Sequence, residues 1–407
     1  MKKRELLLLT DYFPFSDGET FLENEIPYLA ENYNLKIISS DITSLQTRDV
    51  PRGVEVFRIS PKQGYNIWEK IKYIGKFLFS KIGIQEIKEI LEAGINRRSR
   101  LLSSLYFFVQ SQDFLNQLKT SSVFDNLDGA IVYSYWSNYK LLAFVSQKRH
   151  FKAPIITRMH GYDLYNERYT TGRQPFKRQM GAGLDGILFV SNAGMEYYKR
   201  NFGYNSKMHL FRLGTTKCLQ TITREKKHVF TLCSCSNVIP IKRIELIVDG
   251  LCQITETQIR WIHFGDGVSY EKIVALARKL PDNIECIFKG RVRNEEVLEY
   301  YARNQIDCFI TTSETEGCPV SIMEVMSLGI PVIATSVGGI PEMLEHTSNI
   351  LLSNYPNKDE VANAIKEIYL WSDEMKSKVK TENIQRWDSE FNADINNKKL
   401  LEYLNNL

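Results

Sequence analysis

The sequence lacks several features that would assign it to a metal-dependent or disulfide-rich class. It contains no Asp-x-Asp pair, the carboxylate arrangement that commonly holds a divalent cation on a diphosphate. Its seven cysteines are odd in number, lie in the second half of the chain and never form Cys-x-x-Cys, and its six histidines are scattered singly. We therefore expect a reducing environment, no structural zinc and no bound metal.

Long apolar runs are also missing. The first ten residues hold only the short run Leu6–Leu9, and no stretch approaches the roughly 18 apolar residues that a membrane span needs. We therefore expect a cytoplasmic protein that is neither exported nor membrane-spanning. A chain of 407 residues with 43% hydrophobic and 25% charged residues has enough material for two or three domains with their own cores.

Charge is distributed unevenly. Residues 1–213 carry 30 Lys and Arg against 21 Asp and Glu, a net +9, whereas residues 214–407 carry 22 against 27, a net −5. The segment 58–100 holds ten basic and four acidic residues interleaved with aromatic ones. This composition suits an anionic membrane surface. It equally suits an ordinary amphipathic helix with a basic polar face, and the sequence leaves both interpretations open.

Short apolar runs alternate with helix-length segments along the whole chain. Their lack of polar alternation is typical of parallel strands covered on both faces, and ligands of such sheets bind at the carboxyl ends of the strands. A helix is predicted at 19–31, a longer helical stretch at 67–119, and a linker between two α/β units at 215–227. The predicted strands are 6–9, 35–40, 54–59, 130–135, 154–160, 186–191, 229–234, 260–264, 284–289, 307–312 and 331–334.

The segment 311–335 is the richest in candidate functional residues. A strand is predicted to end at Thr312, a loop carries Glu316, and a helix is expected to open near Ser321 with Glu324 in its first turn. Loop amides and a helix N-terminus together bind anions, and two carboxylates can accept hydrogen bonds from sugar hydroxyls. Taken alone, Glu324 is more often a favourable charge at a helix start, and Glu316 is more often a solvated loop residue.

This segment resembles the glutamate-x7-glutamate signature of the retaining GT-B glycosyltransferases of family four. Other segments match that family in the same order: 236–245 resembles the turn with a diphosphate-binding lysine, 262–267 the next strand end, and 288–292 the strand end near the base. In the first half, 12–21 resembles the acceptor-side loop and 158–163 the His-Gly motif. The similarity is greatest to bacterial members that build capsule, exopolysaccharide or lipopolysaccharide.

The resemblance implies an α/β fold of the GT-B type, with two Rossmann-like parallel-sheet domains facing across a cleft. Residues 1–213 would form the acceptor-binding domain and residues 214–386 the nucleotide-sugar-binding domain. Residues 387–407 would form a C-terminal helix that crosses back to the first domain.

The resemblance also implies donor contacts. Lys242 would neutralise the diphosphate leaving group, Glu324 would hold the ribose, and Glu316 would lie beside the donor sugar. Many family members carry an arginine where this chain has Asn237, and Arg243 is the candidate to replace it. The donor-binding residues expected in this way are Gly18, Asn237, Arg243, Arg291, Gly317, Cys318, Val320, Ser321 and Glu324.

The first half would supply the acceptor site. His160 ends a strand before a glycine, so its ring can face the donor sugar and the acceptor. Asp163 would either orient His160 or receive the acceptor proton, and Arg158, which faces the same way along the strand, could meet phosphate or an acidic sugar. Tyr135 lines the acceptor site or the core. The acceptor-binding set is Glu19, Thr20, Tyr135 and Arg158, and the catalytic set is His160, Lys242, Glu316 and Asp163.

The resemblance implies a retaining, metal-independent hexosyltransferase with no cofactor. It would move a sugar from a UDP- or GDP-linked donor to a glycan acceptor carried on polyprenyl diphosphate, at the inner membrane surface, with no nucleic acid as partner. The expected chemistry is front-face attack, with the departing phosphate taking the acceptor proton. Two alternatives stay open: a non-catalytic nucleotide-sugar-binding subunit of a transferase complex, and a GT-B nucleotide-sugar epimerase.

Overall fold

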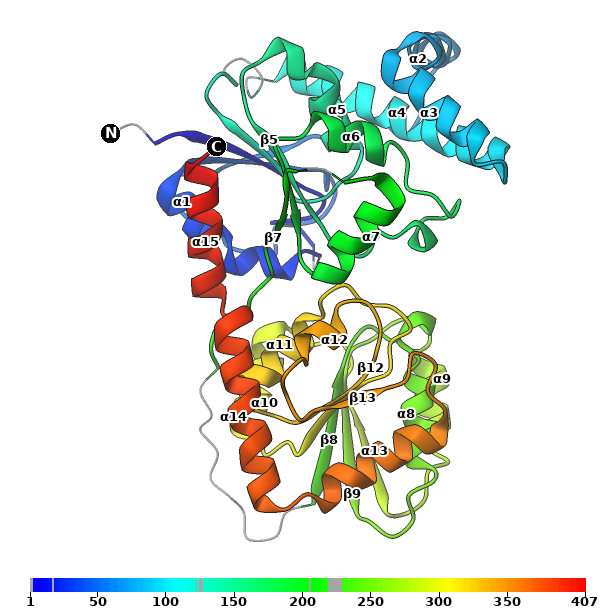
Figure 1. Ribbon diagram of the computed structural model, residues 1–407, viewed down its shortest axis with the longest axis vertical. Coiled ribbons are helices and arrows are strands. Elements are labelled where there is room, and N and C mark those ends of the chain that lie inside the picture. Colours follow the sequence, from blue (N-terminus) through cyan, green and yellow to red (C-terminus); the bar gives the residue numbers. More distant parts are fainter. Residues whose placement is uncertain (1–2, 17, 122, 124–126, 205, 219–228) are drawn as a thin grey trace. The chain divides into compact units, whose positions relative to one another are not determined.

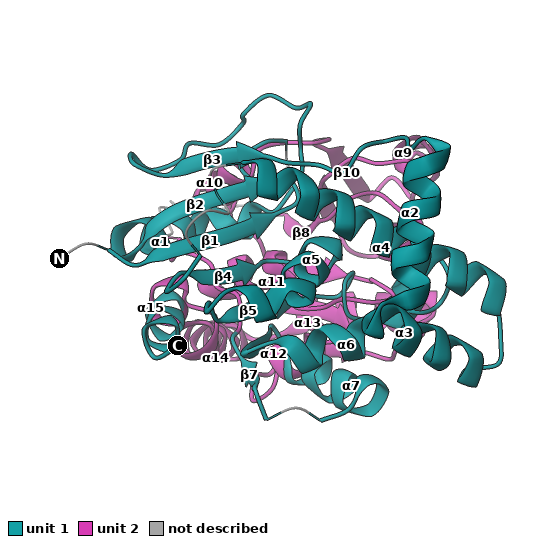
Figure 2. Ribbon diagram, turned by 90° about the horizontal axis from the view of Figure 1, so that it is seen from above, with its two compact units in different colours: residues 1–211, 397–407 teal, residues 212–396 magenta. Residues whose placement is uncertain are grey.

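The computed structural model describes residues 3–16, 18–121, 123, 127–204, 206–218 and 229–407. Contacts divide the chain into one unit of Met1–Phe211 with Asn397–Leu407 and a second unit of Arg212–Asn396 (Figure 2). From residue 219 onward, the predicted linker 215–227 lies outside the described residues. Within the described part of the chain, no helix combines the length and the apolar character that a membrane span requires.

The first unit is built on a parallel sheet with the strand order β3-β2-β1-β4-β5-β6-β7. Successive side chains of a strand alternate between its two faces, so Leu7 and Leu9 enter one core while Leu6 and Leu8 enter the other. Both faces are therefore covered, as the apolar runs predicted. The strands are β1 (Glu5–Thr10), β2 (Asn34–Ser39), β3 (Glu55–Arg58), β4 (Ile131–Ser134), β5 (Ile155–Met159), β6 (Gly186–Phe189) and β7 (Met208–Leu210).

Helices cover both faces of this sheet, with α5 and α6 on one side and α1 and α15 on the other (Figure 1). The predicted helix 19–31 is a 3-10 turn, η1 (Thr20–Asn24), followed by α1 (Ile26–Asn32). Strand β7 was not predicted, because its three residues are too few and too exposed to give a pattern. The remaining α-helices are α2 (Ile67–Phe79), α3 (Lys81–Glu92), α4 (Arg97–Thr120), α5 (Tyr139–Gln147), α6 (Lys177–Gly183) and α7 (Asn192–Phe202).

The single helical stretch predicted at 67–119 is wrong in one respect, because it is three helices. Ser80 has extended backbone and its side chain accepts a hydrogen bond from the amide of Gly83, which starts α3. Asn96 has left-handed backbone and precedes α4. The apolar periodicity runs through both breaks, so it did not reveal them.

The second unit holds a parallel sheet with the order β10-β9-β8-β11-β12-β13. Helices α8, α9 and α13 pack on one face of it around Trp261 and Ile365. The strands are β8 (Phe230–Cys235), β9 (Ile259–Phe264), β10 (Ile284–Phe288), β11 (Cys308–Thr311), β12 (Val332–Thr335) and the unpredicted β13 (Ile350–Leu352). The helical elements are η4 (Pro240–Lys242), α8 (Ile244–Leu251), α9 (Tyr270–Ala277), α10 (Asn294–Arg303), α11 (Val320–Ser327), α12 (Ile340–Met343), α13 (Lys358–Leu370) and α14 (Asp373–Glu390).

The C-terminal segment is not one helix from residue 387. Helix α14 ends at Glu390 and α15 (Ala393–Asn405) begins after a short break, where Thr215 pairs with Asn392. Leu400 and Leu404 of α15 are buried in the core of the first unit. The chain therefore returns to its first unit at its end.

Candidate functional site

The loops at the carboxyl end of the second sheet are tied to one another. The amide of Glu314, after β11, donates to the carbonyl of Ile241, after β8, at 2.8 Å. The amide of Gly339, after β12, donates to the carbonyl of Gly317 at 2.9 Å. The loops that follow β8, β11 and β12 consequently form one continuous surface at the edge where ligands of such sheets bind.

Glycines permit this close approach. A Cβ on Gly338, whose φ is +56°, would lie 1.7 Å from the carbonyl oxygen of Glu316. A Cβ on Gly265, whose φ is +139°, would lie 1.8 Å from the carbonyl oxygen of Ser236. Both positions need glycine for its backbone conformation and for its missing side chain.

Lys242 and Glu316 form an ion pair on this surface. Lys242 is the last residue of η4, and Glu316 lies on the loop between β11 and α11. The sequence predicted that both side chains serve the same ligand, and the structure brings them together. Since neither side chain is fully buried, an incoming anion can compete with Glu316 for the ammonium group.

Glu324 lies in the interior at the same edge. It is the fifth residue of α11, so the prediction that it sits in the first helical turn is wrong: the helix starts at Val320, one residue before the predicted start. Its carboxylate accepts a hydrogen bond from the side-chain amide of Asn294 at 2.7 Å. Burial raises the pKa of Glu324 to about 7, against the smaller lowering effect of this hydrogen bond. No sequence motif pointed to Asn294.

Cys235 shows that Lys242 and Glu324 act on a shared environment. Burial and the charge of Glu324 raise the pKa of this thiol to about 12, while the nearby Tyr301 side chain and the charge of Lys242 lower it. Both charged groups therefore lie within electrostatic range of the Cys235 thiol at the end of β8. Lys242 and Glu324, which the sequence analysis predicted to bind the same nucleotide, therefore lie near each other at the carboxyl edge of the second sheet.

The start of α11 lies at this edge, and the amides of its first two residues have no hydrogen-bond partner within the described part of the chain. Pro319 precedes the helix and no side chain caps it, and the first helical bond runs from the amide of Ile322 to the carbonyl of Pro319 at 3.2 Å. The amides of Val320 and Ser321 precede that bond. Such groups carry the positive end of the helix dipole. Cys318, just before them, is buried, and burial raises its thiol pKa to about 12, so the thiol stays neutral.

Arg243 does not take the role expected of it. Its guanidinium donates to the backbone carbonyls of Thr312 at 2.8 Å, Ser313 at 3.0 Å and Asn354 at 3.3 Å. The side chain therefore fastens the turn after β8 to the loop after β11 and is not available to replace the arginine that the family carries at position 237. Asn237 itself is exposed, as is Arg291 on the loop after β10.

In the first unit, His160 follows β5 and is buried among aromatic rings. Its ring centre lies 4.4 Å from that of Trp136, 4.9 Å from that of Tyr135 and 5.5 Å from that of Phe21. Burial and the nearby charge of Arg158 lower its pKa well below 6.5, so the ring is neutral. Neither ring nitrogen has a hydrogen-bond partner among the described residues. A buried neutral imidazole without partners can both donate to and accept from a ligand hydroxyl.

Asp163 contacts the backbone amide of His160 and does not contact the His160 ring nitrogens. Its carboxylate accepts from the amide of His160 at 2.8 Å and from that of Ser137 at 2.7 Å. Burial raises the pKa of Asp163, against the lowering charge of Lys177. Lys177, which the sequence analysis missed, is itself buried, donates to the carbonyl of Ser137 at 2.5 Å, and has its pKa lowered to about 8 by burial. Asp163 thus contacts the backbone of His160 and not its ring, and both predicted roles, orienting His160 and receiving the acceptor proton, stay predictions.

Arg158 is not open to ligands. Its guanidinium lies 2.6 Å from the carboxylate of Glu25, and the two side chains are only 3% and 4% exposed. It also lies over the rings of Tyr133 and Tyr135, at 5.9 Å and 5.6 Å. Its expected contact with phosphate or an acidic sugar is therefore not supported, because its charge is compensated internally. Tyr135 is fully buried, so it belongs to the core that supports His160.

Glu19 closes the loop after β1. Its carboxylate accepts from the amides of Asp11 at 2.8 Å, Tyr12 at 2.8 Å and Phe13 at 2.6 Å, and from the indole of Trp136. The Glu19 carboxylate, which was expected to bind the acceptor, is therefore already bonded within its own unit.

Gly18 needs to be glycine for a local reason, because a Cβ would lie 2.6 Å from the ring of Tyr12. Gly18 was expected to let the backbone approach a ligand closely, but the group that lies close to it is the ring of Tyr12. Thr20 is exposed at the start of η1, so its side chain is reachable from solvent.

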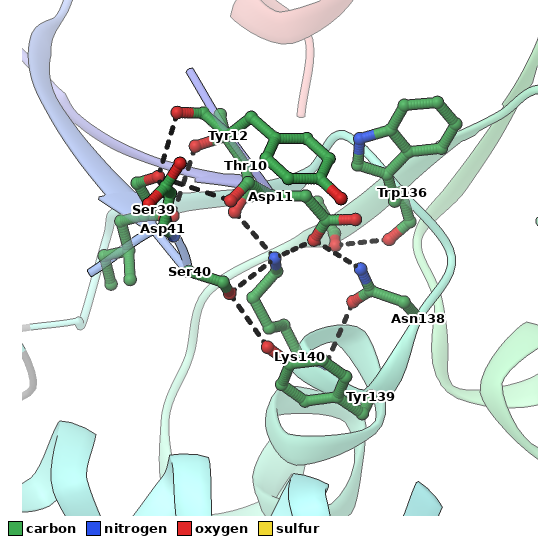
Figure 3. A network of polar contacts seen from close by, with 12 residues as sticks. Thr10, Asp11, Tyr12, Ser39, Ser40, Asp41, Trp136, Asn138, Tyr139 and Lys140 are labelled. Carbon is green, nitrogen blue, oxygen red and sulfur yellow. Dashed lines mark hydrogen bonds and ion pairs between the residues drawn. The ribbon is translucent and has the colours of Figure 1, made fainter. Parts of the chain in front are cut away.

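A buried lysine joins the carboxyl ends of β1 and β2 to α5, as Figure 3 shows. The ammonium of Lys140 donates to the carbonyl of Thr10 at 2.6 Å and to the hydroxyl of Ser40 at 3.0 Å, and it pairs with the carboxylate of Asp11. Asn138 donates to the same carboxylate at 2.8 Å. This network fixes Asp11 directly after β1, and nothing in the sequence pattern distinguished it.

Comparison with known proteins finds similarity in the second unit. Residues 220–386 match the family model of the glycosyl transferases group 1. A segment that makes up 27% of the chain is 33% identical to N-acetyl-alpha-D-glucosaminyl L-malate synthase of Bacillus anthracis and covers 28% of that protein. A longer segment, 48% of the chain, is 26% identical to the O-antigen biosynthesis glycosyltransferase WclY of Escherichia coli and covers 57% of it. The chain thus matches less than two thirds of the length of these relatives.

Solved structures superpose on nearly the whole length of this chain. Sucrose-phosphate synthase from Thermosynechococcus elongatus superposes with a TM-score of 0.72 at 14% identity, covering 99% of both chains. HepE from Anabaena, solved in complex with UDP-glucose, superposes with a TM-score of 0.66 at 15% identity, covering 99% of this chain and 100% of its own. The predicted α/β fold of the GT-B type, with a parallel sheet in each unit, is confirmed.

Proposed function

We propose that this protein is a glycosyltransferase of bacterial surface polysaccharide synthesis, because residues 220–386 match the family model of the glycosyl transferases group 1. Its donor is a nucleotide-diphosphate sugar and its acceptor a glycan. The O-antigen enzyme WclY among the relatives supports the acceptor class, and UDP-glucose in the HepE structure supports a UDP-linked donor.

One observation carries the proposal: Lys242, Glu316, Glu324 and the uncapped start of α11 lie at one edge of the second sheet. The group contains a cation and free amides for a diphosphate, together with two carboxylates for hydroxyl groups. When the diphosphate binds, its oxygens replace Glu316 as the partner of Lys242. Glu316 is then free to accept hydrogen bonds from the donor sugar, while Glu324 accepts them from the ribose.

The proposed reaction retains the configuration of the sugar. The bond between the anomeric carbon and the diphosphate oxygen breaks, and Lys242 with the amides of Val320 and Ser321 stabilises the negative charge that develops. Preorganised groups of this kind contribute about 3 kcal/mol each in the transition state. The acceptor hydroxyl attacks from the same face, and its proton passes to the departing phosphate. Because the protein supplies the positive charge, we propose that no metal is required.

The first unit carries the acceptor groups in this proposal. His160 binds a sugar hydroxyl through a ring nitrogen, since both nitrogens are without partners among the described residues. Asp163 keeps that ring in place by holding the backbone amide of His160. The acceptor is a polyprenyl-diphosphate-linked glycan, which brings the protein to the cytoplasmic face of the membrane as a peripheral enzyme.

The first experiment measures donor binding. Thermal unfolding with UDP-, GDP- and ADP-sugars should show stabilisation by one nucleotide class, by about 2.7 kcal/mol at a hundredfold excess over Kd. Lys242→Met should abolish this shift, whereas Lys272→Met, which changes an exposed lysine of α9, should not. Absence of a shift with every nucleotide sugar would contradict the proposed donor class.

The second experiment measures turnover. Nucleotide release should require a lipid extract as the source of acceptor and should continue in EDTA, and the product should keep the anomeric configuration of the donor. Binding without turnover would favour a non-catalytic subunit. A new nucleotide sugar formed without acceptor would favour an epimerase, and loss of release in EDTA would contradict the metal-free mechanism.

A further inference from the structure

Helices α2 and α3 present large apolar side chains to solvent. Trp68 is 77% exposed and Phe79 is 85% exposed, which is unusual for side chains of this size. Both helices lie at the outer edge of the first unit (Figures 1 and 2). The exposed apolar residues of this surface, here named the α2–α3 face, are Ile67, Trp68, Ile71, Ile74, Leu78, Phe79, Ile84 and Leu91.

The spacing of these residues shows that α2 is apolar on two sides. Ile67, Ile71, Ile74 and Leu78 follow one another at intervals of four, three and four residues, which places them in one stripe. The other side is anchored in the core, where the ring of Phe77 lies 5.5 Å from that of Phe108. A surface helix needs only the anchored side, so the exposed stripe has no structural role in the described residues.

Charge on this surface is predominantly positive. Lysines Lys70, Lys72, Lys76, Lys81 and Lys88 are exposed on α2 and α3. Part of the acidic charge is turned away, because Glu86 and Glu89 both bind Arg173, each with one contact of 3.0 Å. The surface therefore combines an apolar stripe with flanking cations.

We propose that the α2–α3 face binds the surface of an anionic lipid bilayer. Trp68 and Phe79 enter the boundary between headgroups and acyl chains, and the flanking lysines contact lipid phosphates. This inference rests on the proposed function, since a polyprenyl-linked acceptor is presented at such a surface. The basic charge selects a bilayer over a second copy of the chain, because two such faces would repel each other.

The test is sedimentation of the full-length protein with vesicles. Wild-type protein should sediment with phosphatidylcholine vesicles that contain phosphatidylglycerol and should bind far less to phosphatidylcholine alone. The double variant Trp68→Ser/Phe79→Ser should lose about tenfold or more of its vesicle affinity. Its matched control is Tyr355→Ser/Leu370→Ser, which removes residues that are 82% and 76% exposed in the second unit and should bind as wild type.

The lysines are tested separately. Lys70→Gln/Lys72→Gln should lower affinity for the anionic vesicles by about tenfold or more, since each basic residue near such a surface contributes about 1 kcal/mol. Lys398→Gln/Lys399→Gln changes two exposed lysines of α15 and should leave binding unchanged. Equal loss in both pairs would mean that only total charge matters, and would overturn the assignment to this face.

Failure of this inference can be told apart from failure of the proposed function. The vesicle-binding variants should keep the wild-type thermal shift with nucleotide sugar, because the α2–α3 face lies outside the second unit. Nucleotide-sugar binding without vesicle binding would overturn the membrane inference alone. The membrane inference would also be overturned if the wild-type protein were a dimer that vesicles do not affect and that the double substitution Trp68→Ser/Phe79→Ser dissociates. Vesicle binding without nucleotide-sugar binding would leave the membrane surface standing and contradict the donor site.

Discussion

The buried carboxyl group of Glu324 leads to a prediction about stability. Its pKa rises from 4.5 to about 7 in the folded protein, so the folded state holds the proton more tightly than the unfolded state. Stability from this group is therefore complete below about pH 4.5 and is lost as pH rises to about 7, with no further change above. This rise in the pKa corresponds to about 3 kcal/mol as an upper limit.

The variant Glu324→Gln is neutral at every pH and keeps an oxygen that can accept from Asn294. At about pH 8 it should therefore be more stable than wild type, by up to about 3 kcal/mol, and at about pH 4.5 the two should be equal. Urea unfolding at both pH values measures the difference. Glu367→Gln changes an exposed carboxyl group on α13 and serves as the control.

The same variant should lose nucleotide affinity. If the ionised carboxylate accepts hydrogen bonds from the ribose, wild-type affinity for UDP rises as pH rises toward 7, by up to about tenfold per pH unit below the pKa. Glu324→Gln should bind more weakly and without this dependence. Titration calorimetry at several pH values measures both effects.

For the stability prediction, the refuting result is a Glu324→Gln variant that is no more stable than the Glu367→Gln control at about pH 8.

Three further changes test the site and its support. Lys242→Met should reduce turnover by about a hundredfold or more, the effect of losing one preorganised donor, as measured by nucleotide release; unchanged turnover would remove Lys242 from the site. Arg158→Met leaves Glu25 buried without its partner and should cost about 3–5 kcal/mol in urea unfolding, part of which Arg158→Met/Glu25→Leu should restore; equal stability of both variants would argue against the buried pair. Gly338→Ala should lower thermal stability and nucleotide affinity together, because its Cβ would lie 1.7 Å from a backbone oxygen; a variant with wild-type melting and binding would show that the loops relax freely.

Much of the fold could be predicted from local patterns. Buried parallel strands give short apolar runs without alternation, and these identified every strand except β7 and β13 to within a few residues. The two missed strands have only three residues each and are partly exposed. Helix breaks were also missed, because a single serine at position 80 starts a new helix without interrupting the apolar periodicity.

The donor edge was predictable for a related reason. Lys242, Glu316 and Glu324 follow strand ends, and parallel strands bring their carboxyl ends together, so chain position alone placed these residues at one edge of the sheet. The ion pair of Lys242 with Glu316 and the raised pKa of Glu324 then depend on burial and distance. Neither quantity can be read from the order of residues.

The sequence by itself determined most of the elements, the parallel sheets and the edge at which the candidate site lies, because these follow from apolar patterning and strand direction. Only the tertiary structure decided which charged groups are available to a ligand. Arg158, Glu19 and Arg243 carry suitable groups at suitable positions, yet each is occupied: Arg158 by a distant carboxylate, Glu19 by amides of its own loop, and Arg243 by distant carbonyls. A charged group enclosed by the fold must be compensated from within, and the partner that compensates it is chosen by packing in three dimensions.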